Sequence, residues 1–272
     1  MSELTSMLDL ATDLAVRAGR LTLGHFRVGT RPEMKPDDTP VTAADREAET
    51  LIRHEIERRH PGHAVAGEEF GRTEGTEAWR WWIDPIDGTK AFVRGVPLYG
   101  VLIGIERDGE MVAGVAEFPA LGETLAAARG EGCRLNGRRC HVSGVDDLRR
   151  AVVSTTDAGT FASLGKEAAW RRVMDATWVR AGWGDAYGHA LVASGRIEAM
   201  LDPAMHPWDA GPLPVLLAEA GGSYGDWQGR DTIHGEDGVS VNAALRRDVL
   251  NLLAGGGVQV TDVGGGAGTL FK

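Results

Sequence analysis

Apolar residues near the start of the chain recur every three or four positions, which is the spacing of one helical face. The pattern runs from Leu4 to Phe26 and again from Thr42 to Arg59. Such periodicity predicts two amphipathic helices. The apolar face of the second carries Ala43, Ala44, Ala48, Leu51, Ile52 and Ile56. The intervening segment, RPEMKPDDTP, contains three prolines and predicts a loop.

From Trp79 the pattern changes to short apolar runs. WWIDP, YGVLIGIE and MVAGVAEF predict β-strands, and Asp108-Gly109 between the last two predicts a hairpin turn. TLAAARG and CRLNG add two further predicted strands. We therefore expect residues 1–150 to form an N-terminal α+β subdomain.

In the second half of the chain, strands alternate with helices. A strand is predicted over 151–154, and helices are predicted over 167–176, 185–194 and 208–220. This α/β pattern indicates a C-terminal subdomain over 151–254 that shares a cleft with the first. The glycine-rich segment 255–272 predicts a flexible tail.

Composition and charge narrow the class of ligand. Of the 272 residues, 43% are hydrophobic and 25% are charged, which is typical of a globular protein. The net charge of −10 disfavours nucleic acid or an anionic membrane as a partner, because both attract concentrated Lys and Arg. We therefore expect a small ligand. If that ligand is an anion, bound divalent cations would allow so acidic a protein to hold it.

No basic start followed by an apolar core marks a signal peptide, and no stretch is apolar over the roughly 18 residues of a membrane span. The sequence thus predicts a cytoplasmic protein. Cys133 and Cys140 are the only cysteines. Because no metal-ligand spacing surrounds them, we expect two reduced structural thiols.

Three acidic motifs, GEEFG, DPIDGTK and HPWDAG, lie where predicted strands or loops meet helices. Each has an ordinary structural interpretation. DPIDG alone fits an Asx-type turn with a helix cap, GEEFG fits two solvated glutamates, and Trp208-Asp209 fits a helix N-cap with an aromatic staple. Since all three are acidic and each precedes a glycine or a helix start, together they favour one shared site.

The middle motif carries the most information. Asp84 and Asp87 follow the apolar run WWI, which predicts a buried strand. Two carboxylates at so short a spacing repel each other unless a positive charge lies between them, which favours a hard divalent cation. Gly88, Thr89 and Lys90 then begin a predicted helical turn, whose free N–H groups favour phosphate.

GEE, DPIDGT and WDAG, in this order, resemble the motifs of the inositol monophosphatase superfamily of magnesium-dependent, lithium-sensitive phosphatases. The resemblance extends to PVTAADREAE and VSVNAAL, and so covers nearly all of the chain from Met1 to about Leu253. It implies a layered αβαβα sandwich, a homodimer, and a cluster of two or three Mg²⁺ ions at the cleft between the two halves.

By motif, the resemblance implies that the metal ligands are Glu68, Asp84, the carbonyl of Ile86, Asp87 and Asp209. Asp84 would bridge two ions. Glu68 and Thr89 would hold and activate the attacking water, while the amides of Gly88 and Thr89 would bind the phosphate. Supporting roles would fall to the more peripheral Lys35, Thr42 and Asp45.

The superfamily acts on several esters, including inositol phosphates, fructose 1,6-bisphosphate, adenosine 3′,5′-bisphosphate and histidinol phosphate. DPIDGTKAFVRGVPLYGVLIG and WGDAYGHALVASGRIEAMLDP look most like the histidinol-phosphate phosphatase branch, and Lys90 differs from the residues common after DGT in inositol-specific members. The resemblance therefore implies hydrolysis of L-histidinol phosphate in histidine biosynthesis. The alternatives are an inositol monophosphatase with broad sugar or polyol phosphate specificity and a metal-binding protein without turnover.

Asp185 heads a predicted helix that would face the active site, where its carboxylate could bind the cationic amine or imidazole of histidinol. The alternative is an N-cap of its own helix. Arg180 lies five residues before Asp185, whereas the branch would have an arginine four residues before it. Arg180 and Asp209 are further candidate substrate contacts, while His189 and His206 are expected to have packing or surface roles.

Overall fold

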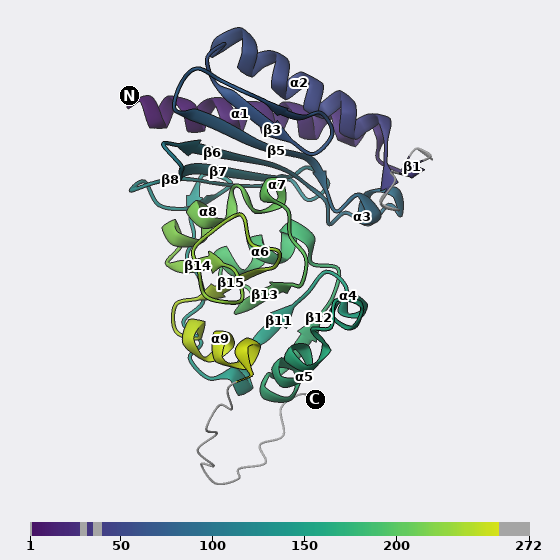
Figure 1. Ribbon diagram of the computed structural model, residues 1–272, viewed down its shortest axis with the longest axis vertical. Helices are drawn as coiled ribbons and strands as arrows, with labels where there is room; N and C mark the ends of the chain where they lie inside the picture. Colours follow the sequence, from purple (N-terminus) through teal and green to yellow (C-terminus); the bar gives the residue numbers. More distant parts are fainter. Residues whose placement is uncertain (1, 28–31, 35–39, 256–272) are drawn as a thin grey trace.

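Layers of helices and β-sheets alternate through the molecule (Figure 1). The computed structural model describes residues 2–27, 32–34 and 40–255. Two sheets are separated by one layer of helices, and a further helical layer covers the outer face of each sheet. The αβαβα sandwich predicted from the sequence is therefore confirmed.

The larger sheet has eight strands in the order β10-β9-β8-β7-β6-β5-β3-β4. Its members are β3 (Ala64–Gly67), β4 (Gly71–Thr73), β5 (Trp79–Asp87), β6 (Gly100–Arg107), β7 (Glu110–Phe118), β8 (Glu123–Ala128), β9 (Arg134–Leu135) and β10 (Arg138–Arg139). All neighbours are antiparallel except β3 and β5, which run parallel. The predicted strands are confirmed, and Asp108-Gly109 forms the β6–β7 turn with positive φ at both residues, as a tight hairpin requires.

Two long helices, α1 (Glu3–His25) and α2 (Ala43–Arg59), cover the outer face of the larger sheet. Leu14 and Ile52, which belong to their predicted apolar faces, are fully buried in one cluster with Trp81 of β5. The apolar spacing along the sequence therefore selects the face that each helix turns toward the sheet. Three short elements complete this half: β1 (Glu33–Met34), β2 (Pro40–Val41) and α3 (Thr89–Val93).

The smaller sheet has five strands in the order β12-β11-β13-β15-β14. They are β11 (Val152–Ser154), β12 (Val179–Ala181), β13 (Ala199–Asp202), β14 (Gly222–Gly225) and β15 (Gly238–Asn242). Its outer face is covered by α4 (Ala158–Ser163), α5 (Glu167–Ala176) and α9 (Arg246–Ala254), and a 3₁₀ turn, η1 (Leu148–Arg150), precedes β11. The division into subdomains at residues 150 and 254 remains a prediction of the sequence.

The space between the sheets is filled mainly by α6 (Asp185–Ala193) and α8 (Leu213–Glu219). Leu216 of α8 belongs to one apolar cluster with Leu102 of the larger sheet and Met200 of the smaller. The middle layer therefore joins the two sheets through a continuous core. Of the three acidic motifs, the one on α7 lies in this layer, while the other two lie on or beside β3, β4 and β5 of the larger sheet.

The single helix predicted over 208–220 is wrong. The structure has two helices there, α7 (Pro207–Ala210) and α8, separated by Gly211 and Pro212. Proline has no N–H for a helical hydrogen bond and its ring clashes with the preceding turn, so a continuous helix cannot pass through this position. Because of this break, α7 and α8 are two separate helices.

Two glycines on adjacent strands allow this break to lie against the larger sheet. Gly104 of β6 and Gly114 of β7 are direct partners in the ladder. A Cβ on Gly104 would lie 2.5 Å from the carbonyl carbon of Gly211, and one on Gly114 would lie 2.5 Å from the carbonyl oxygen of Pro212. Only glycine leaves room for this close approach, which places the segment carrying Asp209.

We expect Gly104→Ala to lower the free energy of unfolding by about 1–3 kcal/mol, because the added methyl group must displace packed backbone. The displacement would also move the segment that carries Asp209. Urea denaturation measures the loss of stability. Gly24→Ala is the matched control, because a Cβ on this glycine of α1 would meet nothing within 4 Å. Equal stability of the two variants would contradict the packing argument.

The described part of the chain contains no helix that is both long enough and apolar enough to cross a membrane. Cys133 and Cys140 are free, in agreement with the predicted reduced thiols. The predicted flexible tail, apart from Gly255, lies outside the described residues, as does Lys35.

Candidate active site

The end of β5 brings two acidic side chains to the same side of the sheet. Residues three apart on a regular strand point to opposite faces. Between Asp84 and Asp87, however, the pairing with β6 shifts register by one residue, from Leu102 to Gly100. This bulge reverses the alternation, and the Ile86 N–H donates a 3.0 Å hydrogen bond to Asp84 Oδ1 within it. Both carboxylates can therefore face the same partner.

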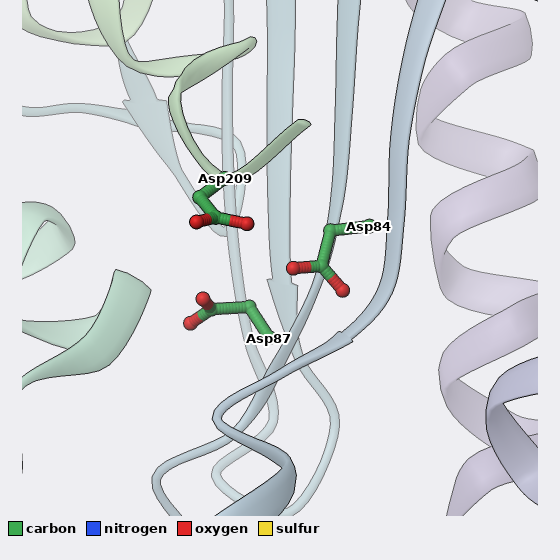
Figure 2. A group of neighbouring side chains, drawn as sticks. All are labelled: Asp84, Asp87 and Asp209. Atoms are coloured by element: carbon green, nitrogen blue, oxygen red, sulfur yellow. The ribbon is translucent and has the colours of Figure 1, made fainter. Parts of the chain in front are cut away.

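A third carboxylate joins them from the middle helical layer. Asp209 projects from α7, and Figure 2 shows its carboxylate directed toward those of Asp84 and Asp87. One oxygen from each of the three lies within 4.8 Å of the others. The Ala186 N–H donates to Asp87 Oδ2 at 2.6 Å, and the His206 N–H donates to Asp209 Oδ2 at 3.0 Å. Backbone groups thus hold two of the carboxylates in place.

Burial, together with the negative charge of neighbouring carboxylates, raises the pKa of every carboxyl group in this cluster. Burial raises the pKa of Asp84 well above its usual value, and the charges of Glu68, Asp87 and Asp209 raise it further. Burial likewise raises the pKa of Asp87, with Asp185 and Asp209 adding to the effect. Burial raises the pKa of Asp209 to about 6. The cluster therefore favours either protons or a bound cation.

Glu68 and Asp45 lie near enough to the cluster for their charges to act on Asp84. The Glu68 N–H donates to the carbonyl of Ile83 on β5 at 3.2 Å. Thr42, at the start of α2, donates from its N–H and its hydroxyl to Asp45 Oδ2 at 2.8 and 2.6 Å. Asp45 Oδ1 is buried and has no hydrogen-bond partner among the described residues. Burial, with the charge of Glu68 as a lesser cause, raises the pKa of Asp45 to about 6.

The sequence pattern did not single out Glu49, although it shapes the same site. This side chain of α2 is fully buried and accepts hydrogen bonds from the Glu69 N–H at 2.8 Å and from Arg53 Nε at 2.6 Å. It therefore holds the turn that carries Glu68. The signal was an acidic residue on the apolar face of the helix, three positions before the fully buried Ile52.

The predicted phosphate-binding turn follows directly. Gly88 has a φ of 79° and precedes the first residue of α3, Thr89. The Thr89 hydroxyl donates to the carbonyl of Ile86 at 3.0 Å. Since a carbonyl oxygen has two lone pairs, this bond leaves the Ile86 carbonyl able to accept a second partner.

A cavity of about 200 Å³ lies beside the cluster. Its walls come from α4, α6 and the segment that joins β13 to α7. Residues that line it include Asp87, Lys90, Asp157, Asp185, Met205 and Asp209. The cavity therefore offers a space for the rest of a molecule whose charged end lies at the three carboxylates.

Asp185 lines this cavity from the first position of α6. Gly184 is the residue before the helix and no side chain caps it, so an N-cap role for Asp185 is wrong. Asp185 has a φ of 41°, a sparsely populated region that Asp and Asn tolerate better than most residues, and its N–H donates to Thr156 Oγ1 at 2.9 Å. Burial, with the charge of Asp202 next in effect, raises the pKa of Asp185 to about 7, and Lys90 opposes this rise.

Arg180 is not brought to the cavity. It lies on β12, where its Nη1 donates to the backbone carbonyls of Thr177 at 2.8 Å and Trp178 at 3.0 Å. The structure therefore separates Arg180 from the other predicted substrate contacts. Spacing along the sequence did not show this, because the guanidinium folds back onto the segment between α5 and β12.

His189 forms the floor of the cavity. Its Nδ1 lies 2.7 Å from Ser240 Oγ and its Nε2 lies 3.2 Å from Asp202 Oδ2, and the ring is buried. Asp202 Oδ1 accepts the Thr156 N–H at 3.1 Å. The expected packing role of His189 therefore extends to fixing Asp202 and Thr156 beneath the site. His206 is exposed, as expected.

The chain is similar to known proteins in both sequence and overall structure. The sequence profile of the inositol monophosphatase family matches residues 3–255. The chain is 44% identical to a histidinol-phosphatase of Chlorobaculum parvum, across 93% of this chain and 98% of that protein. It is 32% identical to an inositol-1-monophosphatase of Mesorhizobium japonicum, across 90% and 95%. The solved structure of an IMPase of Thermotoga maritima has a TM-score of 0.84 and 30% identity, across 92% of this chain and 97% of that one.

Proposed function

The chain belongs to the inositol monophosphatase family, and from this premise we propose that it is a Mg²⁺-dependent phosphatase whose substrate is L-histidinol phosphate. Membership makes it a phosphoric monoester hydrolase. One observation carries the proposal: three carboxylates from two distant segments, the end of β5 and α7, converge beside a cavity that itself has acidic walls.

The donor set suits Mg²⁺. Hard oxygen ligands, chiefly carboxylates and carbonyls, are what this ion prefers. Asp45 adds a buried oxygen without a partner among the described residues, which a coordinated water could satisfy. A cation would also compensate for the burial and the repulsion that raise the pKa values of the cluster. We assign as ligands of two or three ions Glu68, Asp84, the Ile86 carbonyl, Asp87 and Asp209.

Bound Mg²⁺ would supply positive charge that lowers the pKa of water and stabilises the charge on the phosphate. In the reaction, a water oxygen forms a bond to phosphorus and loses a proton, the bond from phosphorus to the ester oxygen breaks, and that ester oxygen takes up a proton in balance. The products are the alcohol and inorganic phosphate. We assign Glu68 and Thr89 to orienting the water, and the N–H groups of Gly88 and Thr89 to holding the phosphate oxygens.

The walls of the cavity favour an alcohol that carries positive charge. Asp157, Asp185 and Asp202 line it in addition to the proposed metal ligands, while Lys90 is the only lysine or arginine that lines it within the described part of the chain. L-Histidinol carries an amine and an imidazole, whereas inositol carries no charge. Charge-assisted hydrogen bonds to carboxylates therefore favour histidinol. The 44% identity to a histidinol-phosphatase supports the same choice.

The test is phosphate release from L-histidinol phosphate and from inositol 1-phosphate, measured side by side at the same Mg²⁺ concentration. We expect kcat/KM to be at least about tenfold higher for L-histidinol phosphate, the minimum that one charge-assisted contact would provide. A preference for inositol 1-phosphate would instead support the second candidate, a broad inositol monophosphatase, which the Mesorhizobium japonicum relative favours. Release from neither ester would contradict the phosphatase proposal itself.

A further inference from the structure

The three carboxylates in the walls of the cavity do not have equivalent environments. Asp202 is buried, and both of its oxygens are already engaged, by the Thr156 N–H and by His189. It is therefore a structural part of the floor. Asp185 and Asp157 remain as carboxylates that a ligand could reach.

Asp185 lies at the phosphate end of the cavity. A Cβ on Gly88, in the proposed phosphate-binding turn, would lie 3.3 Å from Asp185 Oδ2. The next residue, Ala186, donates its N–H to the proposed metal ligand Asp87. A group that contacts Asp185 must therefore sit within a few bonds of the ester oxygen.

Asp157 also lines the cavity, and unlike the mostly buried Asp185 it is exposed, so it belongs to the rim. It precedes α4 as the N-cap residue, and its Oδ1 accepts the Gly159 N–H at 2.8 Å. Its other oxygen has no hydrogen-bond or ion-pair partner among the described residues. Ala204 and Met205 also line the cavity and make part of its wall less polar, which suits the face of a small ring.

L-Histidinol phosphate matches this arrangement in the order of its groups. The amine is attached to the carbon beside the ester-bearing carbon, so it lies close to the phosphate. The imidazole is attached through a CH₂ group to the carbon that carries the amine, on the side away from the phosphate. In either protonation state, at least one of its ring nitrogens carries an N–H. A bound phosphate would thus direct the amine to Asp185 and leave the ring to reach the rim.

We propose that Asp157 is a specificity-determining residue that accepts a hydrogen bond from the imidazole ring of the substrate, while Asp185 holds the amine. This inference rests on the proposed function, because it requires L-histidinol phosphate to be the substrate. In this assignment the start of α4 recognises the ring, while Asp185 of α6 recognises the amine.

The experiment compares three variants on three esters. The variants are Asp157→Asn, Asp185→Asn and the control Asp175→Asn, which makes the same charge change on α5 away from the cavity. The esters are L-histidinol phosphate, phosphoethanolamine, which keeps the amine but has no ring, and glycerol 2-phosphate, which has neither. Asparagine is chosen because it preserves the N-cap at 157 and tolerates the positive φ at 185.

Asp157→Asn is expected to raise KM for L-histidinol phosphate about tenfold with kcat nearly unchanged, since the ring lies away from the reacting bond. Its KM for phosphoethanolamine should change less than about twofold. Asp185→Asn should raise KM for both amines and spare glycerol 2-phosphate, and the control should behave as the unaltered protein.

An Asp157→Asn enzyme that binds both amines as the unaltered protein does, or that loses both equally, would overturn the inference. Asp157→Ser, which also preserves the cap, guards against an effect of asparagine on α4 and should give the same selective loss. Failure of the unaltered protein to hydrolyse L-histidinol phosphate is a different result, because it would refute the proposed substrate before any variant is compared.

Discussion

Asp87→Asn is expected to lower phosphatase activity by about a hundredfold or more while making the metal-free protein more stable. Asparagine has nearly the same shape as aspartate, so it leaves no cavity, and its carbonyl can still accept the Ala186 N–H that now binds Asp87 Oδ2. It removes one negative charge from a proposed metal site, where loss of a single ligand weakens the charge that stabilises the transition state. It also removes one of the repelling charges that raise the pKa of Asp84.

The two effects are measured separately. Phosphate release across a Mg²⁺ titration reports the loss of activity, and thermal unfolding in EDTA at pH 8 reports the stability of the metal-free protein. Asp9→Asn, at an exposed position of α1, makes the same change in net charge and should alter neither. If Asp87→Asn kept its activity with the same Mg²⁺ dependence, Asp87 would not be a metal ligand. If it lowered the unfolding temperature in EDTA, repulsion would not dominate the cluster.

The sequence predicts those parts of the fold and site whose cause is local. WWI followed by Asp84 and Asp87 identifies a buried strand that ends in carboxylates, and the apolar spacing of α1 and α2 identifies the faces that they bury. The acidic motifs were each ambiguous alone, because a cap or a solvated loop uses the same residues. Their resemblance to the motifs of the inositol monophosphatase superfamily supplied the proposed ligand set, and the structure brings three of its members together.

The parts that escaped prediction depend on contacts between distant segments. Proline itself explains the break at Gly211-Pro212. The close packing of this break against the larger sheet, however, depends on Gly104, which lies on a strand about a hundred positions earlier. In the sequence, Glu49 resembles the other charged residues of α2. Its role becomes visible only in the fold, where it accepts a hydrogen bond from the Glu69 N–H. Arg180 lies near Asp185 in sequence, yet its guanidinium binds carbonyls of the segment just before its own strand. These contacts depend on the three-dimensional arrangement of the segments, which the spacing of residues along the sequence does not reveal.

Addition of Mg²⁺ is expected to raise the unfolding temperature of the metal-free protein strongly at pH 8 and weakly at pH 5. In the folded protein the pKa of Asp209 is raised from 3.8 to about 6, and those of Asp84 and Asp87 are also raised. Between pH 3.8 and about pH 6 the folded state therefore binds more protons than the unfolded state, and the free energy of unfolding falls as the pH rises through this range. Protons and Mg²⁺ compete for the same oxygens, so the gain from Mg²⁺ grows over the same window.

The expected size follows from mass action. At a hundredfold excess over its dissociation constant, a ligand that binds only the folded state adds about 2.7 kcal/mol, which is on the order of 5–10 °C for a chain of this size. Differential scanning fluorimetry with and without Mg²⁺ at the two pH values measures the difference, and NaCl at matched ionic strength controls for screening. Asp84→Asn should abolish most of the gain, because it removes the most buried carboxylate of the cluster. A gain of equal size at pH 5 and pH 8 would mean that Mg²⁺ binds elsewhere, since these carboxylates must lose their protons before they can hold it.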